Sequence, residues 1–267
     1  MDKEPTENMQ QGSLIGLALG GGVVLGAAHI GVLRAMHERR LRAGCIAGTS
    51  IGSFIAALHA FGKSWEEIER VALDLDWSDL SGLTLSGYGL LSNRKFGAMV
   101  DRLLGSCRIE DSPIPLAIVA TDISTGGKVV MRQGDVARAV MSSSSVPGVF
   151  CPVESDDMLL VDGVLTENVP ISPLRVMGAD TIICADLFGR HTFRKPQNVV
   201  ELLFNAFYSA MSAVSRIQME GADVVITPDL SNFSLVDISA VPAIIEAGYI
   251  EAQRVLDALM DKELHAG

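Results

Sequence analysis

A serine between two glycines is the first candidate for chemistry in this sequence. Gly48-Thr49-Ser50-Ile51-Gly52 fits the pattern Gly-x-Ser-x-Gly, in which a strand turns sharply into a helix and lifts a serine hydroxyl clear of the backbone. Gly48 and Gly52 remove Cβ atoms that would clash in so tight a turn. The pattern is weak by itself in a chain with 26 glycines, but it lies between a predicted strand and a predicted helix. It therefore predicts nucleophilic catalysis by Ser50.

A glycine-rich loop is the second candidate. Gly20-Gly21-Gly22-Val23-Val24-Leu25-Gly26 lies between a short apolar run and a predicted helix. Bare N–H groups at a helix start bind negative charge, which here is either a nucleotide phosphate or a tetrahedral oxyanion. The nucleotide is disfavoured because the pattern G-x-x-x-x-G-K-[ST] is missing and the second strand ends at Ser50 instead of an acidic residue. We therefore expect an oxyanion hole formed by backbone N–H groups of this loop.

The base that would activate Ser50 is the third piece. None of the five histidines lies in a recognisable catalytic context. His29 follows the glycine loop and could approach the site, although a packed or half-exposed histidine is the favoured interpretation. Asp162, at the end of a predicted strand and followed by Gly163, can serve instead, because sites assemble at the strand ends of parallel sheets. An Asp-Gly pair after a strand is more often only a turn, so this assignment depends on the other two motifs.

The elements that must position these residues alternate between strands and helices. The sequence predicts strands at 14–19, 45–47, 116–122, 128–132, 158–161, 181–185 and 224–227. It predicts helices at 27–39, 53–61, 64–73, 135–141, 199–219 and 243–260. Such alternation implies the α/β class, a three-layer α/β/α sandwich with a mainly parallel central sheet and helices on both faces.

Residues 76–92 interrupt this pattern, with three glycines, scattered leucines and no sustained period. They predict a mobile surface loop. Two interpretations of its apolar side chains are equally favoured: a lid beside an active site, or a structural loop packed on the core. The side chains concerned are Leu83, Leu85, Tyr88, Leu90 and Leu91.

Composition limits the class of protein. A chain of 267 residues that is 48% hydrophobic can form one domain with a core that needs no disulfide or metal. We expect that domain at 14–267, after a polar, disordered tail at 1–13. The net charge of −11 opposes binding to nucleic acid and strong docking on anionic lipid. Any contact with a membrane surface would be apolar, local and transient. The oligomeric state stays open.

Cysteine spacing and the N-terminal residues bear on cofactors and location. The four cysteines lie far apart without zinc-ligand spacing, and we expect no metal and no cofactor. The first residues lack the positive region and apolar core of a secretory signal, which favours a cytoplasmic location with peripheral membrane contact left open. Residues 14–33 carry no formal charge over a membrane-spanning length, but their six glycines disfavour a transmembrane helix, since each costs about 1 kcal/mol there.

Taken together, these segments resemble one family, the patatin-like phospholipases, which includes the esterase domain of neuropathy target esterase. The resemblance runs from about Leu17 to Asp186. It rests on five segments: the glycine loop with Ala28-His29-Ile30-Gly31-Val32-Leu33, the turn 48–52, Ala120-Thr121-Asp122-Ile123-Ser124-Thr125-Gly126, Ser145-Val146-Pro147-Gly148-Val149-Phe150, and Asp162-Gly163. The resemblance implies a Ser50–Asp162 dyad without histidine and an oxyanion hole formed by backbone N–H groups of Gly21, Gly22 and Val23. It also implies hydrolysis of acyl esters of phospholipids or related lipids through an acyl-enzyme.

The sequence departs from the family pattern at three positions. Val23 stands where the third glycine of G-G-G-x-R-G belongs and Leu25 where the arginine belongs, while Val164 replaces the last residue of Asp-Gly-Gly/Ala. If position 23 needs a positive φ, a β-branched valine is strained there. A shift that uses Gly20 to Gly22 as the triplet avoids this but lengthens the loop. The altered loop leaves an alternative open: a lipid-binding or scaffold protein with this fold and weakened catalysis.

Overall fold

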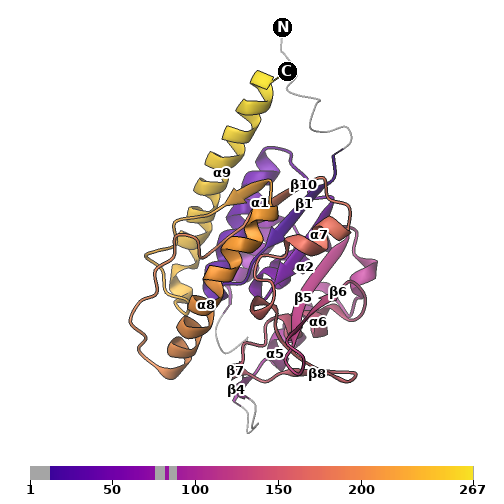
Figure 1. The fold of residues 1–267 in the computed structure, drawn as a ribbon, viewed down its shortest axis with the longest axis vertical. Helices are drawn as coiled ribbons and strands as arrows, with labels where there is room; N and C mark the ends of the chain where they lie inside the picture. The colour runs from indigo at the N-terminus through magenta and orange to yellow at the C-terminus, as the bar shows by residue number, and fades with distance from the viewer. Residues whose placement is uncertain (1–12, 76–81, 84–88, 267) are drawn as a thin grey trace.

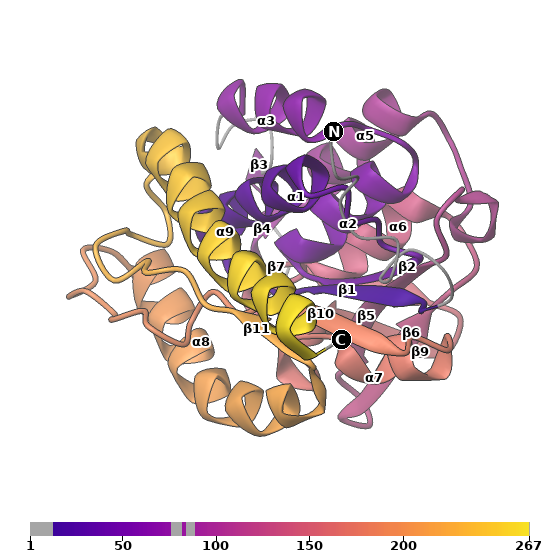
Figure 2. The same cartoon turned by 90° about the horizontal axis from the view of Figure 1, so that it is seen from above.

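The structure, a computed structural model, describes residues 13–75, 82–83 and 89–266, and at 82–83, 213–214 and 262–266 the description covers the backbone alone. Within these residues, an eight-stranded sheet forms the middle layer, in the order β11-β10-β1-β2-β5-β9-β8 with β6 paired to β5. Helices cover both of its faces, as the view from above shows (Figure 2). This confirms the predicted sandwich of a central sheet between helical layers.

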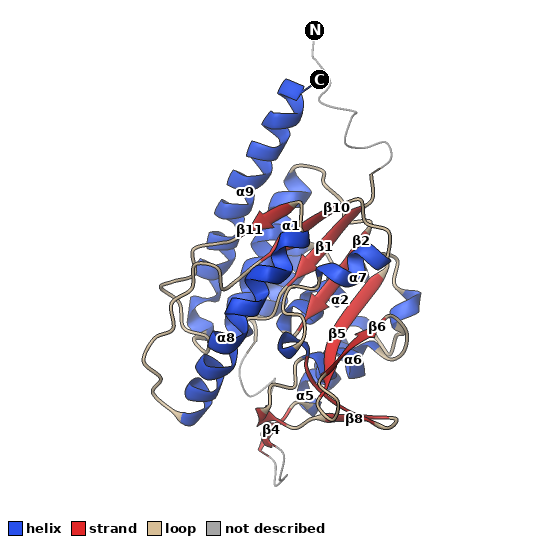
Figure 3. Cartoon of the chain, viewed as in Figure 1, coloured by secondary structure: helices blue, strands red, loops and turns tan. Residues whose placement is uncertain are grey.

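The strands and helices follow one another along most of the chain, as Figure 3 shows by colour. The strands are β1 (Ile15–Leu19), β2 (Cys45–Thr49), β3 (Gly82–Leu83), β4 (Gly89–Ser92), β5 (Leu116–Asp122), β6 (Gly127–Met131), β7 (Gly148–Phe150), β8 (Val153–Ser155), β9 (Met158–Asp162), β10 (Thr181–Ala185) and β11 (Val224–Ile226). The helices are α1 (Ala28–Glu38), α2 (Ile51–Ala60), α3 (Trp65–Leu73), α5 (Arg94–Leu104), α6 (Val136–Ser143), α7 (Ile171–Val176), α8 (Val199–Gln218) and α9 (Val241–Ala266), with short 3-10 turns η1 (Val23–Ala27) and η3 (Gly163–Leu165).

The five strands from β11 to β5 are parallel to one another, while β6, β9 and β8 pair antiparallel at one side. Every residue of β1 is buried, as expected of a strand covered on both faces. Leu17 and Leu19 face the larger core, whereas Ala18 faces a second core, to which the neighbouring strands β2 and β5 also contribute small side chains such as Ala47 and Ala117. Side-chain size therefore alternates with the strand period and lets one helical layer approach the sheet more closely.

The helices form two layers, one on each face of the sheet. Helices α1 and α2 lie on one side of the sheet and α7 and α8 on the other, and α9 packs across α1 (Figures 1 and 2). The α1–α9 crossing is close because both helices have a glycine at it. A Cβ at Gly31 would lie 2.1 Å from the carbonyl oxygen of Ile245, and one at Gly248 would lie 2.1 Å from that of Ala28. This crossing anchors α1, which follows the glycine loop.

Part of the loop expected at 76–92 is regular structure. Strand β4 pairs parallel with β7 and antiparallel with β3, so the prediction of an irregular segment is wrong at 89–92. The strand forms because Leu91 packs against the main core, while Leu90 is 46% exposed. Leu85, Tyr88 and the tail at 1–12 lie outside the described residues, as does the Leu83 side chain. The lid interpretation therefore stays a prediction.

The apolar stretch at 14–33 folds as strand β1, a loop, the turn η1 and the start of α1. This confirms the interpretation that rejected a transmembrane helix there. In the part of the chain that the structure describes, no helix combines the length and apolarity needed to cross a membrane. Helix α5, which the sequence analysis did not predict, packs against α6.

Candidate active site

The turn from β2 into α2 holds Ser50 in a rare backbone conformation. Its φ of 53° and ψ of −129° lie in a region that costs a non-glycine residue about 1–3 kcal/mol. The glycines beside it are required by packing. A Cβ at Gly52 would lie 2.1 Å from the carbonyl oxygen of Leu19, and one at Gly48 would lie 2.4 Å from Cα of Ser53. The turn is therefore the strained strand-to-helix elbow that the sequence pattern predicts.

Ser50 and Asp162 meet in the interior. The Ser50 hydroxyl donates a 2.7 Å hydrogen bond to Oδ2 of Asp162, and the Val164 N–H donates one of 2.9 Å to Oδ1. Asp162 is fully buried. Burial raises the pKa of its carboxyl group to about 7, against the opposing effect of the two hydrogen bonds. A carboxylate with a pKa near neutrality, in contact with a serine hydroxyl, can act as a general base.

The strand that carries Asp162 does not run as the sequence analysis assumed. β9 is antiparallel to β5, so Asp162 does not stand at the carboxyl end of a parallel strand. Thr49 pairs with Val119 on one side of β5, and Asp162 pairs with Ala120 on the other. Strand β9 starts at the carboxyl edge of the parallel strands and ends beside the elbow. This direction brings the Asp162 carboxylate level with Ser50.

The glycine loop lies against the elbow. A Cβ at Gly21 would lie 3.0 Å from Cβ of Ser50. The Gly21 N–H donates a 3.0 Å hydrogen bond to the Asn168 side-chain oxygen, whereas no hydrogen bond from the amides of Gly22 and Val23 is found within the described part of the chain. Val23 has a φ of 52°, so the strain expected for a β-branched residue at this position is present.

His29 holds the loop instead of activating the serine. Its Nε2–H donates a 2.7 Å hydrogen bond to the carbonyl oxygen of Gly20, and the side chain is buried. Burial lowers the pKa of His29 to about 4, so the imidazole is neutral at pH 7. The interpretation of His29 as a packed histidine is therefore supported by its burial, and its contact with Gly20 gives it a positioning role.

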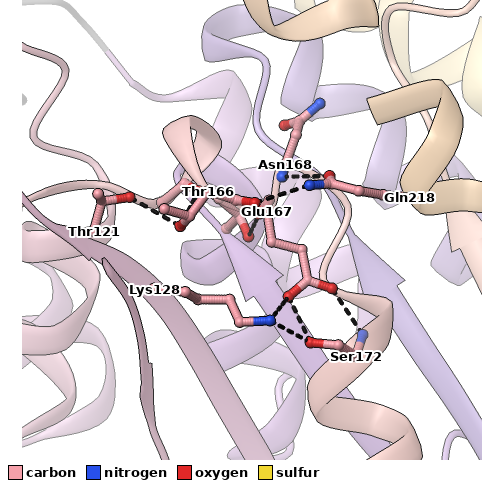
Figure 4. Close-up of polar contacts among 9 residues, drawn as sticks. Thr121, Lys128, Thr166, Glu167, Asn168, Ser172 and Gln218 are labelled. Atoms are coloured by element: carbon pink, nitrogen blue, oxygen red, sulfur yellow. Dashed lines mark hydrogen bonds and ion pairs between the residues drawn. The ribbon is translucent and has the colours of Figure 1, made fainter. Parts of the chain in front are cut away.

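Polar contacts tie the segment after Asp162 to neighbouring strands and helices, as Figure 4 shows. Lys128 of β6 forms a 2.9 Å ion pair with the buried Glu167, which also accepts hydrogen bonds from Ser172 of α7. Further contacts join this segment to β5 and α8: Thr121 with Thr166, and Gln218 with Thr166 and the Asn168 amide. The network therefore fixes Asn168, whose side chain in turn holds Gly21.

Two polar residues at this site escaped the sequence analysis. Ser143, at the end of α6, accepts a 2.8 Å hydrogen bond from the Ser50 amide and donates one of 2.6 Å to the Val119 carbonyl. Asn168 holds Gly21 across 147 residues. Ser143 stands in a run of four serines and Asn168 in an unremarkable loop sequence. No local pattern distinguishes either residue, because their partners are distant in the chain.

An apolar cavity of about 110 Å³ opens beside Ser50. Its walls come from η1, α2, α5, α8 and neighbouring segments, and among the residues that the structure describes no charged side chain lines it. Val23 from the glycine loop, Phe54 from α2 and Phe204 from α8 are among the lining residues. The cavity can therefore hold an uncharged, apolar group within reach of the serine hydroxyl.

The fold and this site define a class of α/β protein, with a serine elbow after the second strand of a largely parallel sheet and a buried carboxylate bonded to that serine. Comparison with known families is consistent with this class. The sequence profile described as "Patatin-like phospholipase" matches residues 17–175. The chain therefore belongs to the patatin-like phospholipase family, which confirms the resemblance seen in the sequence. Family membership supports lipid acyl hydrolysis as the class of activity.

Curated relatives are longer than this chain. Two uncharacterized NTE family proteins of Mycobacterium tuberculosis are similar to it. One is 35% identical over 66% of this chain and 49% of its own length, and the other is 30% identical over 94% and 48%. Lysophospholipase NTE1 of Pyricularia oryzae is 27% identical over 94% of this chain and 19% of its own. The chain thus spans about half the length of the mycobacterial relatives.

Solved structures share the fold at low sequence identity. VipD from Legionella pneumophila superposes with a TM-score of 0.67 at 14% identity, over 92% of this chain and 67% of that one. The type III effector protein ExoU superposes with a TM-score of 0.51, also at 14% identity, over 93% of this chain and 53% of that one. At these identities the two structures show the fold alone.

Proposed function

We propose that this protein is a serine-dependent lipid acyl hydrolase, a carboxylic ester hydrolase in which Ser50 is the nucleophile and Asp162 its base. The observation that carries this proposal is the 2.7 Å hydrogen bond from the Ser50 hydroxyl to Asp162, made at the wall of an apolar cavity. A nucleophile and a base in hydrogen-bonding contact are what acyl transfer through a covalent intermediate needs.

The first step forms an acyl-enzyme. Oγ of Ser50 attacks the ester carbonyl carbon while its proton passes to Oδ2 of Asp162. The carbonyl oxygen becomes an oxyanion, which the free amides of Gly22 and Val23 would stabilise. The Gly21 amide, which is bonded to Asn168, would hold the loop in place instead of donating to the substrate. As the ester bond breaks, Asp162 returns the proton to the departing alcohol.

The second step releases the fatty acid. Water takes the place of the alcohol and loses a proton to Asp162 as it attacks the acyl carbon. The same amides stabilise the second oxyanion, and Ser50 leaves with the proton that Asp162 held. The net reaction is hydrolysis of one ester bond, with both residues restored. No metal or cofactor takes part in this sequence of steps.

The proposed substrates are acyl esters of phospholipids, lysophospholipids or simpler alcohols. The described lining residues of the cavity are uncharged and favour an alkyl chain over a polar group, because burying a charge there without a partner is costly. The relative named Lysophospholipase NTE1 supports a lipid ester. The proposal includes cytoplasmic location and transient contact with a lipid surface. Apolar side chains would make that contact, since a net charge of −11 disfavours electrostatic docking.

The test is a panel of p-nitrophenyl esters and phospholipids with purified wild-type protein, Ser50→Ala and Asp162→Asn. We expect turnover by the wild type that both substitutions abolish, and covalent labelling of the wild type by a fluorophosphonate that Ser50→Ala prevents. Labelling of Ser50→Ala at the wild-type rate would remove Ser50 from its role. Wild-type protein that binds lipid micelles without hydrolysing any ester would favour the lipid-binding alternative.

A further inference from the structure

A tyrosine on α8 lies beside the dyad without an evident structural reason for its hydroxyl group. Tyr208 is fully buried. Its hydroxyl makes no hydrogen bond of ordinary geometry with the residues that the structure describes, although the Ser50 hydroxyl is near enough to affect its pKa. A buried, unpaired hydroxyl lowers stability compared with phenylalanine, because it has lost water without gaining a partner. Such a group calls for an explanation at the place where it lies.

The ring of Tyr208 is held by aromatic packing. It stacks on Phe188 with ring centres 4.7 Å apart, and Phe207 meets it edge-on at 5.2 Å. Phe188 follows Leu187, whose Cδ1 lies 2.6 Å from where a Cβ of Gly22 would be. The same short segment after β10 therefore packs against both the tyrosine ring and the glycine loop. The position of the ring does not depend on its hydroxyl.

Helix α8, which carries Tyr208, contacts the turn η3 that begins directly after Asp162. Phe204, one helical turn before Tyr208, lines the cavity together with Ser50. The pKa of the Tyr208 phenol is raised well above its ordinary value, first by burial and then by the charge of Asp162, while the Ser50 hydroxyl interacts with it in the opposite sense. The phenol therefore keeps its proton at pH 7, and the two polar groups that act on it are the members of the dyad.

We propose that Tyr208 is a third catalytic residue, whose O–H donates a hydrogen bond to Oγ of Ser50 while that oxygen carries negative charge. This inference rests on the proposed function. In the first step the Ser50 proton goes to Asp162 and Oγ bonds to the acyl carbon, so the charge on Oγ rises and then falls. In the second step Oγ leaves the acyl carbon and the charge rises again. Tyr208 keeps its own proton throughout, and no bond to it forms or breaks.

The resting geometry agrees with this role. At rest, the Ser50 hydroxyl donates to Asp162 and Oγ is neutral, so it is a weak acceptor. Loss of the proton turns Oγ into a charged acceptor, to which hydrogen bonds are stronger. The phenol thus gains its partner only as the reaction proceeds, and interactions made only in the transition state are those that raise the rate.

Tyr208→Phe tests the inference, because it removes one oxygen and keeps the stacked ring. We expect fluorophosphonate labelling of Ser50 and kcat for p-nitrophenyl esters to fall roughly 10- to 100-fold. We expect KM to stay unchanged and the urea midpoint of unfolding to stay unchanged or rise. A structural defect would instead lower the unfolding midpoint together with the rate. The inference would also be overturned if Tyr208→Phe unfolded at a lower urea concentration while its folded fraction was labelled at the wild-type rate.

Tyr249→Phe is the matched control. The Tyr249 hydroxyl on α9 donates a 2.6 Å hydrogen bond to Glu38 and accepts one from Gln253, so its removal should lower stability and leave the rate unchanged. If Tyr208→Phe labels and hydrolyses at the wild-type rate while Ser50→Ala is inactive, the inference about Tyr208 fails and the proposed function stands. If Ser50→Ala retains wild-type activity, the proposed function fails as well.

Discussion

The two turns that bring chemistry to this site make a direct comparison. The glycine loop follows β1 and the elbow follows β2, two neighbouring parallel strands whose ends pair at Leu19 and Gly48. Each turn leads into a helix on the same side of the sheet, and each holds one non-glycine residue at positive φ: Val23 at 52° and Ser50 at 53°. Both turns therefore store backbone strain within the same small region.

The turns differ in what surrounds their glycines. In the elbow, a Cβ at Gly52 or Gly48 would meet backbone atoms, at 2.1 Å and 2.4 Å. In the loop, a Cβ at Gly21 would meet Cγ2 of Val164 and one at Gly22 would meet Cδ1 of Leu187, both at 2.6 Å. The flexible end of Leu187 can rotate away, and the stiffer Val164 side chain can shift, more easily than backbone atoms can. The elbow is thus rigidly specified, while the loop tolerates a departure such as Val23.

The largest expected effect is the difference in unfolding free energy between Gly52→Ala and Gly22→Ala. Gly52→Ala should lower the free energy of unfolding by about 3 kcal/mol or more, because the methyl group has no space between backbone atoms. Gly22→Ala should cost roughly 1 kcal/mol, because the Leu187 side chain that a new methyl group would meet can move. Urea denaturation of both variants measures this. Equal losses would remove the distinction between the two turns.

A smaller expected effect is the dependence of catalysis on pH. It should come from the elbow alone, because the base of its serine titrates and the backbone amides of the glycine loop do not. The base must be ionised, and the pKa of Asp162 is about 7. We expect kcat/KM to rise with pH to a plateau above the pKa, and to lie about 100-fold lower two pH units below it. A pH–rate profile on a neutral ester measures this. A flat profile from pH 5 to 8 would exclude Asp162 as the base.

Stability should change with pH in the opposite sense. The pKa of Asp162 is raised on folding, from about 3.9 in an unfolded chain to about 7, so the folded state binds the proton more tightly. The resulting stabilisation is complete below the unfolded pKa and is lost as pH rises through the folded pKa. The unfolding free energy of the wild type relative to Asp162→Asn should therefore decrease between about pH 4 and pH 8.

The smallest expected effect is within the glycine loop. Val23 and Val24 are adjacent and both half-buried against the cavity, but only Val23 has positive φ. Val24→Gly should cost about 1 kcal/mol or more through chain entropy and lost packing. Val23→Gly should change the unfolding free energy by less than about 1 kcal/mol, because relief of strain offsets those losses. Equal costs at the two positions would show that Val23 is not strained.

Much of this architecture could be predicted from local patterns. The helix predicted at 64–73 forms as α3, with Ser64 as its N-cap and a capping box to Glu67, and strand β10 has the predicted bounds at 181–185. The elbow could be located because its geometry is set by residues adjacent in sequence. Strand β4 was missed because it forms by pairing with the distant strand β7. Helix α5 was missed although Phe96, Met99 and Val100 have the spacing of an amphipathic helix. The predicted direction of β9 was also wrong, because the pairing of strands depends on residues that are distant in the chain.

The sequence by itself determined which residues could react: a serine in an elbow, glycines with free amides, and an aspartate after a strand. Only the tertiary structure decided that Ser50 and Asp162, 112 residues apart, share a hydrogen bond. It also decided that Asn168 takes the Gly21 amide and that Tyr208 lies beside the dyad. The physical reason is burial. Removal from water raises the pKa of Asp162 and leaves the Tyr208 hydroxyl unpaired, and burial arises only when distant segments pack together.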